Sequence, residues 1–205
     1  MPSVRLLDNQ ALVAADIAGM TAAWNDTATV LAARWPGGQG PPLPQLTAEQ
    51  MAVRLGQRHI RTYVYDERDI GGLRVAGFGQ ITLHRPDFDE PVIEVDISVA
   101  GVRRQAGEAI TDTRRRFRRS LVRCVARIAS DLRTVEQNRG IAVAVQGTVP
   151  AVSDPDDTQY ITTAHAFLAE LATRSGVALT PQGPMVHLSM SPQQLADALA
   201  GMAAP

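Results

Sequence analysis

The fold is decided by the stretch Val95-Asp96-Ile97-Ser98-Val99-Ala100-Gly101-Val102-Arg103-Arg104-Gln105-Ala106-Gly107-Glu108-Ala109-Ile110. Its first part alternates apolar and polar residues, which is typical of a half-buried strand. It then passes through a short turn into a helical pattern, so the first backbone N–H groups of that helix are expected to be unpaired. These groups, with the positive end of the helix dipole behind them, form a site that suits a phosphate.

Three strand-like runs lead up to this turn, over 60–65, 74–83 and 91–99. A turn over 66–72 is predicted between the first two runs. The third run alternates, which puts two sets of side chains on opposite faces of the strand. The apolar face holds Ile93, Val95, Ile97 and Val99, and the polar face holds Glu94, Asp96 and Ser98.

A long helix is predicted after the turn, because apolar residues recur three, four or seven positions apart until Gly140, a common helix stop. Cys124 lies beside this apolar stripe and is therefore expected to be buried and unreactive. Earlier in the chain, 10–31 has a helical pattern, and Thr47 with Gln50 forms a capping-box pattern that starts a short helix.

The remaining chain predicts a short strand at 141–145, a helix at 161–175, a single strand at 185–190 and a last helix opened by Ser191-Pro192. A proline- and glycine-rich segment, 35–46, is predicted to be a loop. Residues 191–205 are read as a C-terminal helix and tail.

Composition limits the function only broadly. The net charge is −1, and all twenty basic residues are arginines. One cysteine excludes an intrachain disulfide and a zinc site of several cysteines. No leader pattern and no apolar run of roughly 18 residues are present, so we expect a cytoplasmic protein without membrane contact.

The stretch resembles the acetyl-CoA loop of the GNAT superfamily of N-acetyltransferases, which has a hydrophobic strand end, then Arg/Gln-x-x-Gly-x-Gly/Ala, then a helix. Val99, Arg104, Gly107 and Ala109 match that pattern. Glu108 departs from it, because an apolar residue is usual there. The order of the predicted elements resembles the same family. The resemblance implies an α/β (α+β) fold, with a GNAT-like mixed, mostly antiparallel central sheet flanked by helices, in a single domain over 1–205.

The resemblance also implies acetyl-CoA as co-substrate, no metal, and a small-molecule or peptide amine as acceptor. Backbone groups of Ile97 and Val99 would contact the pantetheine arm and the developing oxyanion. The pyrophosphate would be held by the N–H groups of Arg104, Gln105, Ala106, Gly107, Glu108 and Ala109.

Proton transfer requires side chains as well. Glu94 is the expected general base and Asp96 the second candidate. Leu168 stands where the family has the tyrosine that acts as general acid, so Tyr160 is the candidate for that role instead.

Two other functions remain open at this point. The missing tyrosine and Glu108 favour a catalytically silent relative that binds CoA or a protein partner. Eleven of the twenty arginines lie in 103–139, which would suit a nucleic-acid or scaffold protein, although the even overall charge makes nucleic acid the weaker alternative. A homodimer is compatible with all of these.

Overall fold

The computed structural model describes residues 3–34, 44–69, 72–84, 92–100, 107–150, 161–183 and 185–202. Its centre is a seven-stranded sheet with the strand order β1-β2-β3-β4-β5-β7-β6. The strands are β1 (Ser3–Leu6), β2 (Ile60–Asp69), β3 (Gly72–His84), β4 (Val92–Ala100), β5 (Ala142–Pro150), β6 (Thr180–Gln182) and β7 (Met185–Met190).

Neighbouring strands of this sheet are antiparallel except for β4 and β5, which are parallel. A parallel pair needs a crossover, and the long helix between the two strands supplies it. The predicted fold class is confirmed: the sheet is mixed, mostly antiparallel, flanked by helices, and GNAT-like in its order of elements.

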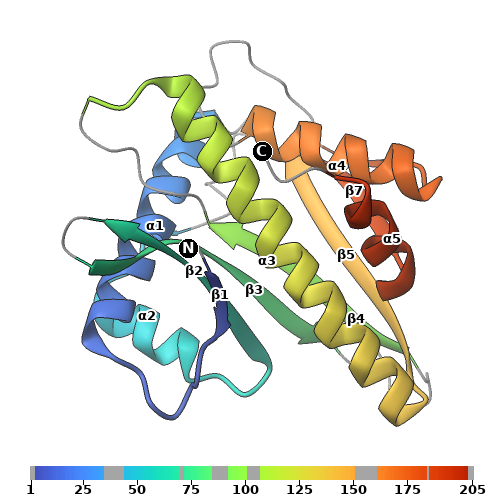
Figure 1. Cartoon of the computed structure of the whole chain (residues 1–205), viewed down its shortest axis with the longest axis horizontal. Helices are drawn as coiled ribbons and strands as arrows, with labels where there is room; N and C mark the ends of the chain where they lie inside the picture. The colour runs from blue at the N-terminus through green and yellow to red at the C-terminus, as the bar shows by residue number, and fades with distance from the viewer. Residues whose placement is uncertain are drawn as a thin grey trace.

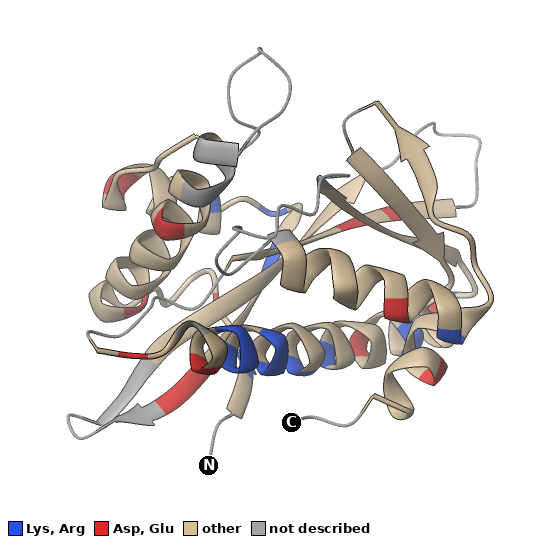
Figure 2. Ribbon diagram, turned by 90° about the horizontal axis from the view of Figure 1, so that it is seen from above, with Lys and Arg blue, Asp and Glu red and all other residues tan. Residues whose placement is uncertain are grey.

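Helices cover both faces of the sheet (Figures 1 and 2). The helices are α1 (Ala14–Arg34), α2 (Ala48–Leu55), α3 (Ile110–Arg139), α4 (Ile161–Ser175) and α5 (Pro192–Ala200). One buried cluster joins α1 and α2 to one face, through residues such as Trp24, Met51 and Phe78. A larger cluster joins α3, α4 and α5 to the other face, through residues such as Val95, Phe117 and Leu171.

Local signals in the sequence set the ends of several helices. The predicted capping box forms, since Thr47 accepts from the Gln50 backbone and Gln50 reaches back. Ser191 caps α5 as predicted, and Gln194 completes a second capping box there. α3 ends at Gly140, whose φ of 62° is a left-handed conformation that glycine adopts without strain. These three predictions are confirmed.

The alternation of β4 is also as predicted. Val95 is fully buried in the cluster beneath α3, and Ile93, Ile97 and Val99 pack against that cluster. Ala100, which shares a face with Ser98, packs instead with α1 and α2. Glu94, Asp96 and Ser98 therefore belong to the α1/α2 face. Cys124 is fully buried, as expected.

Several predicted boundaries, and the prediction of a single strand after α4, were wrong. β2 runs on to Asp69 and β3 starts at Gly72, because the ladder continues past a bulge at Tyr65/Asp66 where the sequence indicated a turn. β5 extends to Pro150, since β7 pairs with its second half. Two strands follow α4, because Thr180–Gln182 forms a hairpin with β7. α1 starts at Ala14 instead of residue 10. Of the predicted 35–46 loop, residues 35–43 lie outside the described residues.

Candidate active site

The parallel strands β4 and β5 separate halfway along their length. Their pairing runs from Val92 opposite Ala142 to Asp96 opposite Gln146. Beyond that point β4 remains paired with β3 up to Ala100, while β5 continues against β7. In the described sheet, residues 97–100 of β4 thus have no strand partner on the β5 side. This part of β4 is an open strand edge inside the fold.

A cavity of about 610 Å³ lies where the strands separate. It is within the size range of pockets that bind small molecules. Asp96, Ile97, Ser98 and Val99 line it from β4, and residues 145–149 line it from β5. The remaining walls come from α3, α4, β6, β7 and α5, together with Thr27 of α1.

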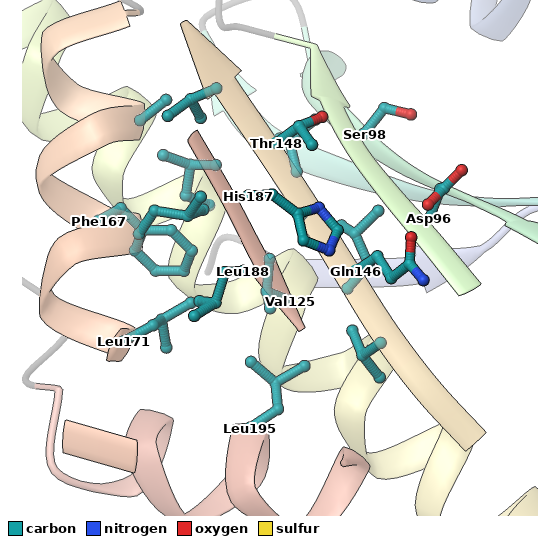
Figure 3. Close-up of a pocket in the computed structure, with 18 of the residues that line it drawn as sticks. Asp96, Ser98, Val125, Gln146, Thr148, Phe167, Leu171, His187, Leu188 and Leu195 are labelled. Carbon is teal, nitrogen blue, oxygen red and sulfur yellow. The ribbon is translucent and has the colours of Figure 1, made fainter. Parts of the chain in front are cut away.

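The cavity is polar on one side of the sheet and apolar on the other. Strand alternation puts Asp96, Ser98, Gln146 and Thr148 on the α1/α2 side, and His187 lies opposite Thr148 on β7. Figure 3 shows Asp96 and Ser98 extending from β4, with Phe167 and Leu171 of α4 across the cavity. The apolar side is closed by residues of α3, α4 and α5, among them Val125, Phe167, Leu168, Leu171 and Leu195.

The two predicted acidic residues lie at different places along β4. Asp96 lines the cavity at the last paired position, and its Oδ2 lies 2.8 Å from Nε2 of His84 on β3. Glu94 is two residues earlier, opposite Ala144, where β4 still has strands on both sides. Glu94 does not line the cavity. Tyr160 lies outside the described residues.

The predicted anion loop is described only at its end, because Arg104, Gln105 and Ala106 lie outside the described residues. Gly107 has a φ of 78°, which glycine adopts without strain. Ala109 is the N-cap residue of α3, and its side chain accepts no hydrogen bond. The backbone N–H groups in the first turn of α3 therefore have no acceptor from the N-cap side chain.

Glu108, the departure from the family pattern, is held by an arginine. Nε and Nη2 of Arg116 donate to the two carboxylate oxygens of Glu108, each at 2.7 Å. Nη1 of Arg116 also donates to Oε2 of Glu67 at 3.2 Å. The negative charge of Glu108 is therefore compensated by a cation of the same chain.

Sequence reasoning missed several polar residues of the cavity. Nothing in the sequence singled out His187, yet it lines the cavity, and its Nδ1 is buried without a hydrogen-bond partner in the described part of the chain. Gln146 and Thr148 were missed because the predicted strand stopped at Val145. The alternation of 185–190 could have indicated that His187 and Ser189 share a face. Leu168 is buried in the cavity wall.

The arginine-rich part of α3 is largely engaged within the protein. Figure 2 shows arginines along the first half of this helix. Arg115 pairs with Asp112, Arg116 with Glu108 and Glu67, and Arg118 with Glu170. The bridge from Arg118 is the main reason that the pKa of Glu170 is lowered. Two of these pairs join α3 to its neighbours: Arg116 with Glu67 of β2, and Arg118 with Glu170 of α4.

The described ranges contain neither a candidate membrane-spanning helix nor a candidate cluster of metal ligands. No helix there has the length and apolar character that a membrane span requires. No three or more histidine, cysteine, aspartate or glutamate side chains gather there as metal ligands would.

No protein-family model matches this chain, and no curated protein sequence does. Its fold and its cavity between diverging strands define a GNAT-like α/β protein. Similar solved structures include an acetyltransferase of the GNAT family from Streptococcus pneumoniae, with 14% identity, a TM-score of 0.48, and coverage of 93% of this chain and 99% of that one.

Two further similar structures are also acetyltransferases. One is from Thermus thermophilus, with 11% identity, a TM-score of 0.45, and coverage of 92% of this chain and 97% of that one. The other is the spermidine/spermine N-acetyltransferase SpeG from Vibrio cholerae, with 11% identity, a TM-score of 0.42, and coverage of 95% of this chain and 97% of that one. At these values, no residue role or substrate is transferred to this chain.

Proposed function

We propose that this protein is an N-acyltransferase that moves an acyl group, acetyl in the simplest case, from a CoA thioester to an amine. The observation that carries the proposal is the open edge of β4 over 97–100, which lines a cavity of about 610 Å³. An extended ligand with amide groups can pair with such an edge as an added strand does. The pantetheine arm of CoA is such a ligand, and Ile97 and Val99 are its proposed backbone partners.

The diphosphate of CoA would lie at the start of α3, just beyond the end of β4. Gly107, Glu108 and Ala109 lead into that helix, whose N-terminus favours negative charge. The Arg116 guanidinium holds the carboxylate of Glu108, so that this charge does not oppose the diphosphate. Arg104, Gln105 and Ala106 stay part of the proposed loop on the basis of the sequence resemblance.

The reaction needs one C–N bond to form and one C–S bond to break. The amine must first lose a proton, and the sulfur of CoA finally carries one. Asp96 is the proposed acceptor of the amine proton, because it lines the cavity where the strands separate. Glu94, the base expected from the sequence, becomes the second candidate, because it lies two residues farther from the open edge and does not line the cavity.

The leaving thiolate is a weak base, because thiols ionise at a pKa of about 8.5. A strong general acid is therefore not essential, so the reaction can proceed with Leu168 in place of the family's tyrosine. His187 is the proposed proton donor to the sulfur, since its imidazole lies in the cavity. Backbone N–H groups near Val99 would stabilise the oxyanion.

A thermal shift with acetyl-CoA tests the binding step. At 100 times its dissociation constant, a ligand stabilises the folded state by about 2.7 kcal/mol. For a chain of this size, that corresponds to a rise in Tm of about 5–10 °C. No rise at millimolar acetyl-CoA would refute the proposal.

The position of the bound ligand is tested by filling the cavity. A Cβ at Gly147 would meet only Leu168 Cδ1, at 3.7 Å, so Gly147→Val should fold while its side chain occupies the cavity. This variant should lose most of the shift with acetyl-CoA. Thr180→Val, on the exposed strand β6, is the control and should keep it.

An assay of turnover distinguishes an active enzyme from a catalytically silent relative. The buried Leu168 in the cavity wall is the observation that favours a silent CoA-binding protein. Release of free CoA in the presence of an amine, with the acylated amine detected by mass spectrometry, supports the enzyme. Binding of acetyl-CoA without any acylated product supports the silent relative.

A further inference from the structure

A second cavity, of about 390 Å³, lies between α1, α2 and β4. The residues that line it include Trp24 of α1, Leu46 just before α2, Gln50 and Arg54 of α2, and Ser98 of β4. Ser98 also lines the larger cavity between β4 and β5. The two cavities therefore meet at this residue, on the α1/α2 face of the sheet. A molecule in the second cavity lies next to the site that we assign to the thioester.

Arg54 is held in this second cavity by a buried polar chain of contacts. Its Nε donates to Oε1 of Gln80 at 2.9 Å, and Nε2 of Gln80 donates to Oγ1 of Thr62 at 3.0 Å. Gln80 and Thr62 are fully buried and lie opposite each other on β3 and β2. On its other side Gln80 lies opposite Ser98. The guanidinium is thus fixed over the strand position where the two cavities meet.

The charge of Arg54 has no carboxylate partner in the described part of the chain. Besides Gln80, the guanidinium contacts the Trp24 ring, whose centroid lies 4.8 Å from Cζ. Its partial burial lowers the pKa of the guanidinium, as expected when solvation is lost without a counter-ion. By contrast, Arg5, Arg116 and Arg118 each pair with at least one carboxylate. An arginine left in this state at a cavity wall is typical of a site for an anionic group.

We propose that Arg54 binds a carboxylate of the acceptor, so that the acceptor is an amino acid. The inference rests on the acyltransferase function proposed above and names the acceptor class of that reaction. The carboxylate would take the Nη donors of Arg54, and the amine would then point past Ser98 toward the thioester. Trp24 and Leu46 supply apolar wall, which suits an apolar side chain. A polyamine would bring further positive charge to Arg54 and is therefore disfavoured.

The test compares amines that differ only in the carboxylate. L-Leucine is paired with 3-methylbutylamine, L-phenylalanine with 2-phenylethylamine, and spermidine is added as a polycationic acceptor. A hydrogen-bonded charge contributes about 1.5–3 kcal/mol, so kcat/KM should favour each amino acid at least about tenfold over its decarboxylated partner. A wild-type enzyme that acylates the simple amines or spermidine as well as the amino acids overturns the proposal.

Three variants locate the effect. Arg54→Gln should remove the preference for the amino acid, and Arg54→Lys should restore part of it, because lysine keeps the charge without the planar fork. Arg58→Gln is the matched control: it removes the same charge from an exposed position just after α2 and should keep the preference. A preference that survives in Arg54→Gln overturns the proposal. Thermal melts verify that each variant is folded.

Direct binding keeps this inference separate from the proposed activity. Calorimetry with L-leucine, L-phenylalanine and their decarboxylated partners is carried out with and without CoA. If no amine is acylated, binding of either amino acid that Arg54→Gln abolishes still supports the carboxylate site, while the catalytic proposal fails. If acetyl-CoA binds and neither amino acid binds better than its partner, the carboxylate site fails, while the CoA site stands.

Discussion

Arg116 of α3 is expected to contribute strongly to the stability of the fold, because it pairs with Glu108 and Glu67 in a nearly buried group. The side chains of Arg116, Glu67 and Glu108 are only 14%, 13% and 11% exposed. Removing one partner of a fully buried ion pair costs about 3–5 kcal/mol, since a charge is left without compensation. Because each side chain keeps a little exposure, we expect Arg116→Met to cost about 3 kcal/mol, at the low end of that range. For a chain of this size, Tm should then fall by about 6–12 °C.

Urea unfolding followed by circular dichroism measures this loss, and two variants test its cause. Arg115→Met is the control, because Arg115 is 59% exposed and pairs with the exposed Asp112, so its loss should cost about 0–1 kcal/mol. Adding Glu67→Gln and Glu108→Gln to Arg116→Met removes the uncompensated carboxylates and should recover most of the stability. A loss below about 1 kcal/mol in Arg116→Met, or no recovery in the triple variant, would refute the reasoning.

Two further predictions concern packing. Cys124 is fully buried, and burial raises the pKa of its thiol to about 12. A thiol reagent at about pH 8 should therefore label it only as fast as the protein unfolds. Rapid labelling of the native protein would contradict the placement of α3. Replacing a glycine by alanine inside a helix usually stabilises it by about 1 kcal/mol. At Gly19 of α1, however, the added Cβ would lie 2.8 Å from Cβ of Val75. Overpacking costs about 1–3 kcal/mol, so this variant should be less stable in urea, and Gly19→Ala with Val75→Ala should regain part of the loss.

The helices and the faces of the strands could be predicted because their causes are local. Two capping patterns, the stop at Gly140 and the alternation of β4 each depend on a few neighbouring residues. The errors in the strands arose where a distant strand decides the outcome. β5 continues past Val145 because β7 pairs with it, and β2 continues past a bulge because β3 supplies the ladder. No nearby residue in either strand indicates that partner.

The two halves of the candidate site differ in the same way. The donor half that we propose could be inferred from sequence, because backbone groups of one continuous stretch, 97–109, would carry it, and a spacing of glycine and arginine is enough to indicate such a stretch. The acceptor half that we propose depends on side chains of Trp24, Arg54, Gln80 and Ser98, which lie on four separate elements. Arg54 stands in an ordinary helical pattern, and its contacts with Trp24 and the buried Gln80 are apparent only in the folded chain. The proposed donor is therefore indicated by a motif, whereas the proposed acceptor is inferred from the charge of Arg54, which has no carboxylate partner among the described residues.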